Sequence, residues 1–331
     1  MIPTLRYNTW VEITLNKTIT KKALFVILFF LLVSAFSNCS SASTQNGKKA
    51  DNRQSENYQP PQTVGKISTS EIKESSGIAA SRCNEGILWT HNDSGDGAFV
   101  YALKITGELV GTWKVSGAEN VDWEDISASK NDKGECFLYI GDIGNNVRSR
   151  GVFAVYKVKE PRISDFVKPS SKKNPNITET AEAIRFEYPD LRHDAETLLI
   201  NPNSGEIYIL SKRISDSSGV YKLSANYSNS KTNKLEKVAN FKVPAVPNGL
   251  LTGGDISPDG KRVIICDYFN AYEIVLPQNA ADFDEIWQQK PKIVTLGERE
   301  QGEAVCYSAD GKSIFATSEK KDSPLIKVNR Q

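Results

Sequence analysis

Two adjacent segments decide the predicted fold: Gly254-Asp255-Ile256-Ser257-Pro258-Asp259-Gly260-Lys261 and the apolar run 263–266 that follows it. A short strand opens on an acidic residue, Pro-Asp-Gly has the chemistry of a tight turn, and a second apolar strand follows. The same unit recurs along the chain, each time as a small or acidic pair, an aliphatic residue, a polar turn and a strand. The aliphatic residues of the five copies are Ile78, Ile126, Leu198, Ile256 and Val305.

Each copy continues into further strands. Third strands are expected at 99–103, 152–156, 220–223, 271–274 and 325–328, and fourth strands follow in four copies, for example at 110–115 and 238–243. Four strands in a unit of roughly 50 residues are typical of a β-propeller blade. The sequence therefore predicts an all-β β-propeller of five four-stranded blades.

The two ends of the chain indicate how the ring closes. The last copy stops after three strands at Gln331, while a strand-like piece at 63–68 is left over before the first copy. That piece can supply the missing outer strand of the last blade, which removes an exposed sheet edge. A sixth blade is possible if 157–181 hides a degenerate copy, although its Pro, Ser, Lys and Asn content favours an inserted loop. A β-sandwich is the competing architecture.

The N-terminal region reads as an export signal. Lys21 and Lys22 precede an apolar run at 23–36, and Cys39 follows directly in a pattern that resembles a bacterial lipoprotein. We expect a signal peptide at 1–38, a lipid on Cys39, a disordered tether at 39–62 and the propeller at 63–331. This predicts an exported, membrane-anchored lipoprotein of the bacterial cell envelope, at the outer membrane or the periplasmic face. Cleavage without lipid and an uncleaved anchor are the alternatives.

Charge and composition exclude several classes of function. Lys and Arg number 41 against 40 Asp and Glu, and there is no long basic run, so we expect no nucleic-acid partner. Two His and one Met argue against a His-rich transition-metal centre. Beyond Cys39, the cysteines Cys83, Cys136, Cys266 and Cys306 allow three disulfide pairings in an exported chain, or they are buried thiols on strands.

Seven phrases carry a family resemblance. They lie at 76–82, 88–96, 122–126, 139–146, 194–198, 255–260 and 301–304. Together they resemble an uncharacterised family of secreted bacterial β-propeller proteins, over essentially all of the chain after residue 70. More distantly, the layout is similar to esterase-like phytase and gluconolactonase-type propellers. That similarity implies a calcium ion held by acidic and Asn side chains around the central channel.

Carboxylates are expected to converge on that channel, because the first strand of every blade lines it. The opening residues of the first strands include Glu124, Asp125, Glu196, Asp255 and Glu303, and the second strands end near Asp93, Asp142, Asp267 and Glu319. Crowded carboxylates raise one another's pKa or bind a cation, and oxygen ligands without a His or Cys set favour calcium over zinc. The predicted calcium ligands are Glu124, Asp142, Glu196, Asp267 and Glu303. Alternatively, such residues accept backbone N–H bonds from neighbouring blades.

Catalytic residues are harder to identify. The candidates are His91 and Asp93 in the polar loop 91–96, which also suits an Asx-rich turn, and His193; either histidine could be a general base. The chain has no Gly-x-Ser-x-Gly nucleophile elbow, and Lys212-Arg213 could meet an anionic substrate or form a solvated surface pair. Two functions follow. One is an envelope propeller that binds an unidentified ligand or envelope protein; the other is a calcium-dependent hydrolase of ester, lactone or phosphoester bonds.

Overall fold

The computed structural model describes residues 57–165, 169–214, 216–247 and 249–331. The predicted signal peptide, the lipidation site Cys39 and residues 39–56 of the predicted tether lie outside these residues, whereas its last residues, 57–62, are part of the described fold. Within them, no helix is both long enough and apolar enough to cross a membrane.

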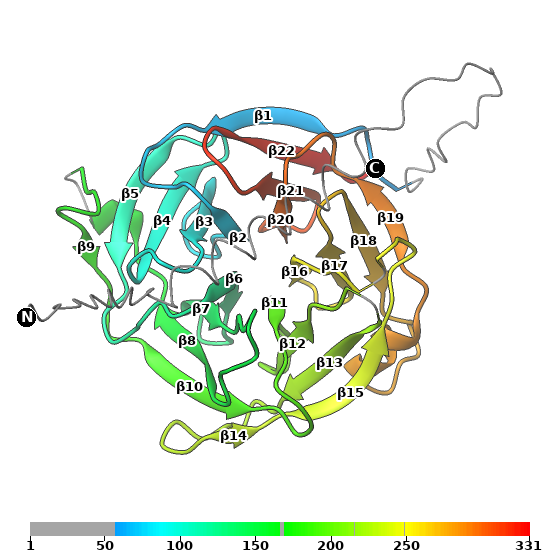
Figure 1. The fold of residues 1–331 in the computed structure, drawn as a ribbon. Coiled ribbons are helices and arrows are strands. Elements are labelled where there is room, and N and C mark those ends of the chain that lie inside the picture. Colours follow the sequence, from blue (N-terminus) through cyan, green and yellow to red (C-terminus); the bar gives the residue numbers. More distant parts are fainter. Residues whose placement is uncertain (1–56, 166–168, 215, 248) are drawn as a thin grey trace, which may run out of the picture. The chain divides into compact units, whose positions relative to one another are not determined.

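Five sheets are arranged in a ring around a central axis, which confirms the predicted five-bladed propeller (Figure 1). The inner strands are β2 (Ser75–Ala80), β6 (Trp123–Lys130), β11 (Ala195–Ile200), β16 (Gly253–Ile256) and β20 (Gly302–Tyr307). The second strands are β3 (Ile87–Asn92), β7 (Cys136–Asp142), β12 (Ile207–Ser211), β17 (Arg262–Cys266) and β21 (Ser313–Ser318). The third strands are β4 (Phe99–Lys104), β8 (Phe153–Lys159), β13 (Ser218–Leu223), β18 (Asn270–Val275) and β22 (Ser323–Asn329). The fourth strands are β5 (Leu109–Lys114), β10 (Glu182–Glu187), β15 (Glu236–Phe241), β19 (Lys292–Thr295) and, closing the ring, β1 (Gln62–Ile67).

The blades pack through alternate side chains of their strands. In β12, Ile207 and Ile209 join the core shared with the second blade, while Tyr208 and Leu210 join the core shared with the fourth. A strand buried on both faces needs no polar alternation, which is why its sequence is an unbroken apolar run. Each buried aliphatic or aromatic side chain contributes about 1.5–3 kcal/mol.

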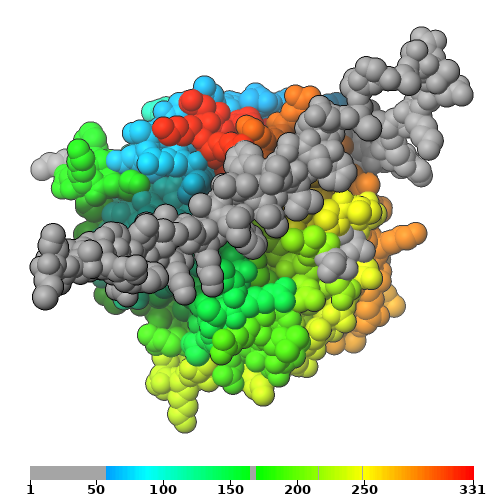
Figure 2. Space-filling view, viewed as in Figure 1, coloured from blue at the N-terminus to red at the C-terminus, as the bar shows by residue number. Residues whose placement is uncertain are grey.

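The ring closes as the sequence predicts. Strand β1 pairs antiparallel with β22, with Gln62 opposite Lys327 and Ile67 opposite Ser323. Ahead of β1, Tyr58 makes a further bridge to Arg330. The two ends of the described chain therefore lie side by side, blue against red (Figure 2).

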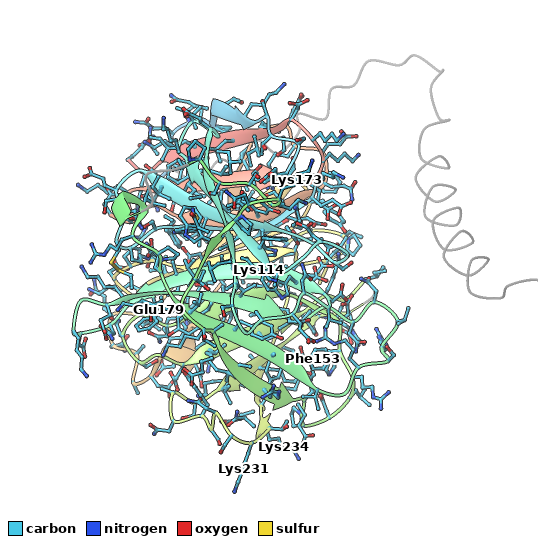
Figure 3. All side chains as sticks on the ribbon, turned by 90° about the vertical axis from the view of Figure 1, so that its left-hand side faces the viewer. Lys114, Phe153, Lys173, Glu179, Lys231 and Lys234 are labelled. Carbon is cyan, nitrogen blue, oxygen red and sulfur yellow. A yellow bond between two sulfur atoms is a disulfide. The ribbon has the colours of Figure 1, made fainter. Side chains whose placement is uncertain are left out.

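The expected inserted loop is present, and it extends a sheet without adding a blade. It leaves β8, contains the short 3-10 helix η1 (Ile163–Asp165), and pairs through β9 (Asn176–Ile177) parallel to β5 of the first blade. A similar two-residue strand, β14 (Asn233–Lys234), pairs parallel to β10. The edge-on view shows both additions on the rim, beside Lys114 and at Lys234 (Figure 3).

Both readings of the cysteines hold, for different residues. Cys83 and Cys136 form a disulfide that ties the inner turn of the first blade to that of the second. Cys266 and Cys306 are free thiols buried in the ring, and burial raises the pKa of Cys266 to about 12.

This arrangement predicts the thiol chemistry of the chain from Ser40 onward. A thiol-specific reagent is expected to label no cysteine in the native state, because the two free thiols are buried and protonated. After unfolding without reductant it should label two, and after unfolding with reductant four. Four reactive thiols without reductant would show that the disulfide does not form.

Candidate functional site

The candidate site lies at the end of the channel where the inner strands begin. Because successive strands alternate in direction, the second strands end at that same face, as do the connections from each fourth strand to the next blade. Both kinds of loop therefore converge there, at what we call the mouth (Figure 1).

Four inner strands have a β-bulge just at the mouth. The register shifts between Ser75 and Gly77 in β2, and at the equivalent position in β6, β11 and β20. The residues skipped by the pairing are Ser76, Glu124, Glu196 and Glu303. A bulge redirects the extra residue's side chain, and three of the four bulged residues are glutamates.

One group of carboxylates has the spacing of metal ligands. Oxygens of Asp93, Asp122 and Glu124 lie within 4.8 Å of one another. Two ligands of one Ca²⁺, each at about 2.3–2.6 Å from the ion, are separated by at most about 5 Å. Gly144 lies over this group, and a Cβ there would approach Glu124 Oε1 to 2.1 Å and Asp122 Oδ2 to 2.6 Å. Glycine is therefore required here, because any side chain would clash with the carboxylates.

Burial and mutual repulsion make these carboxylates costly to ionise. Burial raises the pKa of Asp93 to about 7, with Asp122 and Glu319 adding to the effect. Burial also raises the pKa of Glu124 well above its ordinary value, and the charges of Glu196 and Asp93 raise it further. A bound divalent cation would remove this penalty, so the cluster has the electrostatics of a cation site.

A second group adjoins the first. Lys212 Nζ donates to Glu196 Oε1 and, at 2.9 Å, to the Tyr268 hydroxyl. Burial raises the pKa of Glu196 to about 7 even though Lys212 opposes the shift. The other oxygen of Glu196, Oε2, is buried and has no hydrogen-bond partner among the described residues. Glu303 shares a hydrogen bond with Glu319, and its pKa is raised well above the usual range by burial and by Glu196.

Below the mouth, the channel is crossed by side chains. Asp125 Oδ2 accepts the N–H of Leu198 at 2.9 Å and that of Gly254 at 3.3 Å, so one carboxylate links three blades. Asp255 likewise accepts the N–H of Tyr307 at 3.0 Å. Arg82 Nη2 lies 3.6 Å from Asp255 Oδ2. These contacts link the inner strands of the blades to one another.

Two of the predicted calcium ligands have protein partners. Asp142 lies beside the first group but pairs with Arg150 Nη1 at 2.7 Å and accepts the Asp122 N–H at 3.1 Å. Asp267 accepts two N–H groups of its own turn and the Tyr272 hydroxyl at 2.6 Å. The other three predicted ligands, Glu124, Glu196 and Glu303, are the bulged glutamates of the mouth.

Neither histidine belongs to the group of clustered carboxylates. His91 is fully buried against the edge of Trp123, with Nδ1 3.0 Å from the Asn92 carbonyl oxygen, and burial lowers its pKa to about 4. His193 lies in the connection between β10 and β11, where its Nε2 is 2.9 Å from Asp190 Oδ1. Of the three catalytic candidates, Asp93 alone belongs to the carboxylate group.

Sequence reasoning did not assign Asp122 to the site, and it gave Lys212 only as part of a pair that could meet an anionic substrate or be solvated. Asp122 stands in the phrase Asp122-Trp123-Glu124-Asp125, one position before the inner strand, so its place in the repeat was the available signal. Lys212 is the first residue after its second strand, a position that carries an acidic residue in three other blades, at Asp93, Asp267 and Glu319. The basic residue at this position forms an ion pair with Glu196 of the neighbouring strand in the same blade.

Calcium fits these residues. The three clustered carboxylates supply hard oxygen ligands, and the unpartnered Oε2 of Glu196 is a further oxygen nearby. No cysteine or histidine joins the group among the described residues, which disfavours zinc.

Comparison with known proteins gives structural neighbours only. No protein-family model matches the chain, and no curated protein does. A PQQ-bound aldose sugar dehydrogenase from Streptomyces coelicolor aligns over 82% of this chain and 98% of its own, at 10% identity and a TM-score of 0.46. A gluconolactonase from Xanthomonas campestris aligns over 82% and 89%, at 10% identity and a TM-score of 0.45. A luciferin-regenerating enzyme aligns over 80% and 94%, at 8% identity and a TM-score of 0.42. Identities at this level say nothing of substrate.

Proposed function

We propose that this protein is an exported, lipid-anchored propeller of the bacterial cell envelope that binds its ligand through a calcium ion at the mouth. The observation that carries the proposal is the approach of Asp93, Asp122 and Glu124 to within 4.8 Å of one another. A chain with a net charge of only +1 concentrates carboxylates here, at the cost of raised pKa values that cation binding would relieve.

The surroundings of the mouth support a binding role. Seven of the ten exposed large apolar side chains of the described residues lie in loops of this face. They are Val121, Val147, Val152, Leu191, Ile214, Val246 and Phe269. Exposed apolar side chains gathered at one face mark a surface that another molecule covers. The ligand would therefore meet oxygen ligands at the centre and apolar contacts around them.

A second candidate function is the calcium-dependent hydrolysis of an ester, lactone or phosphoester. It is favoured by Glu196, whose pKa of about 7 and bond to Lys212 suit a group that accepts a proton from water near neutral pH. Calcium, when bound, would polarise the scissile carbonyl or phosphoryl group. Lys212, which also donates to the Tyr268 hydroxyl, would hold the Glu196 carboxylate in place.

Calorimetric titration of the chelator-treated chain from Ser40 onward tests the proposal. We expect one calcium ion per chain, with the acidic groups releasing protons on binding below pH 7. A flat titration at millimolar calcium would rule out the site. A screen of esters, lactones and phosphoesters with calcium separates the two functions: turnover that disappears in Glu196→Gln identifies a hydrolase, and calcium binding without turnover supports a ligand-binding propeller.

A further inference from the structure

The loop between β8 and β10 crosses from the second blade to the first and is fastened to the outer edge of the first blade. Residues 169–177 of this loop, which we call the strap, end in β9, which pairs with β5. Ser170 Oγ accepts the N–H of Thr112 in β5 at 2.9 Å. A bridge between Ser171 and Asn174 closes a tight turn in the strap. The strap is therefore built into the first blade, although its chain comes from the second.

Lys172, inside that turn, contacts two segments of the first blade. Its Nζ donates to Asp96 Oδ1 at 2.7 Å, and both side chains are partly buried. Its backbone N–H donates to Glu71 Oε1 at 3.0 Å, while Glu71 Oε2 accepts the Thr112 hydroxyl at 2.7 Å. Lys172 thus holds both the loop after β3, which contains Asp96, and the segment before β2, which contains Glu71.

Asp96 connects this contact to the residue beside Asp93. Its Oδ2 accepts the side-chain amide of Asn92 at 2.7 Å, and the same amide donates to the Glu71 carbonyl oxygen at 2.8 Å. Asp93 itself donates its backbone N–H to the Glu74 carbonyl oxygen at 3.2 Å. The two segments that Lys172 holds therefore form one hydrogen-bonded unit, and Asp93 is part of it.

We propose that the strap positions Asp93 for calcium, acting through the ion pair of Lys172 with Asp96. The inference rests on the proposed function, in which Asp93 is one of three clustered ligands. Lys172 acts on this ligand through Asp96, so it is a positioning residue. Removing an outer partner of this kind typically lowers metal affinity about 10–100-fold, because the ligand is then no longer held in the geometry that the ion needs.

The sign of the effect separates positioning from simple electrostatics. Lys172 is a cation, so the loss of its charge alone would leave calcium affinity unchanged or slightly higher. If Lys172 positions Asp93, its loss lowers the affinity even though a positive charge has been removed. Lys173 provides the matched control, because it is the next residue along the strap and its side chain is exposed (Figure 3).

Calorimetric titration of the chelator-treated chain from Ser40 onward with calcium is the test. Lys172→Met keeps the length of the side chain and removes its charge, and it is expected to bind calcium about tenfold more weakly than wild type. Lys172→Arg should recover most of the affinity, and Lys173→Ala should bind as wild type does or slightly more tightly. In chelator, where no ion needs its ligands, the melting temperature of Lys172→Met should shift by only a few degrees, because a partly exposed ion pair contributes little to stability.

A second substitution tests the route through Asp96. Asp96→Ala is expected to weaken calcium binding at least as much as Lys172→Met, and adding Lys172→Met to it should cost nothing further. A wild-type chain that binds no calcium would overturn the proposed function and this inference with it. Wild-type affinity in Lys172→Met, equal weakening by Lys173→Ala, or additive losses in the double variant would overturn this inference alone.

Discussion

Asp125→Ala is expected to destabilise the propeller by about 3–5 kcal/mol, a large share of the stability of a typical domain. The carboxylate is fully buried and accepts three backbone N–H groups, those of Ile126, Leu198 and Gly254. The alanine variant leaves these donors unpaired in the middle of three blades. An unsatisfied buried N–H costs about 1–3 kcal/mol. Chemical unfolding, with the midpoint and slope compared to wild type, measures the loss.

Two matched variants interpret this result. Asp125→Asn retains one carbonyl oxygen for the N–H groups of Leu198 and Gly254 and should recover part of the loss. Asp132→Ala removes an exposed carboxylate in the turn between β6 and β7, and its effect should stay within about 0.5 kcal/mol. If Asp125→Ala were as stable as Asp132→Ala, the inter-blade bonds of Asp125 would contribute nothing net.

The fold could be predicted because the same strand–turn–strand pattern occurs in the sequence of every blade. The aliphatic residues Ile78, Ile126, Leu198, Ile256 and Val305 all occupy buried inner strands. The leftover strand before the first copy joins the last blade, as ring closure requires. By contrast, the parallel pairing of β9 with β5 could not be predicted, because a strand of two residues is too short to show a periodic pattern. The choice of Cys83 and Cys136 from three possible pairings also needed coordinates.

The site could be predicted only in part, for two physical reasons. A β-bulge skips one residue of a strand, and alternation in the sequence does not reveal which one. The three bulged glutamates could nevertheless be predicted from the sequence, because an acidic residue recurs at one position of the repeat. The role of Asp142 could not be predicted, because it depends on an ion pair with Arg150, a residue outside the repeated pattern. Asp122, with no such ion pair, turns toward Glu124 instead.

The largest effect on binding is expected from Glu124→Gln. A wild-type chain in calcium at 100 times its dissociation constant should gain about 2.7 kcal/mol, or roughly 5 °C or more in melting temperature. The variant should lose most of this gain, because it removes a charged ligand from the three that lie within 4.8 Å. Thermal melts with calcium or chelator, together with calorimetry, provide the measurement.

The same variant should behave oppositely without calcium. Because folding raises the pKa of Glu124, the folded chain binds the proton more tightly than the unfolded chain does, so this group's contribution falls as pH rises toward the folded pKa. At pH 8 in chelator, Glu124→Gln should therefore melt at or above wild type. Asp267→Asn, in contrast, keeps one oxygen for the N–H groups of Phe269 and Asn270 but replaces the other, which accepts the Tyr272 hydroxyl, with an amide group. It should melt lower with and without calcium while retaining the calcium-dependent gain. If Asp267→Asn abolished that gain and Glu124→Gln kept it, the ion would be held at Asp267 and not by Asp93, Asp122 and Glu124.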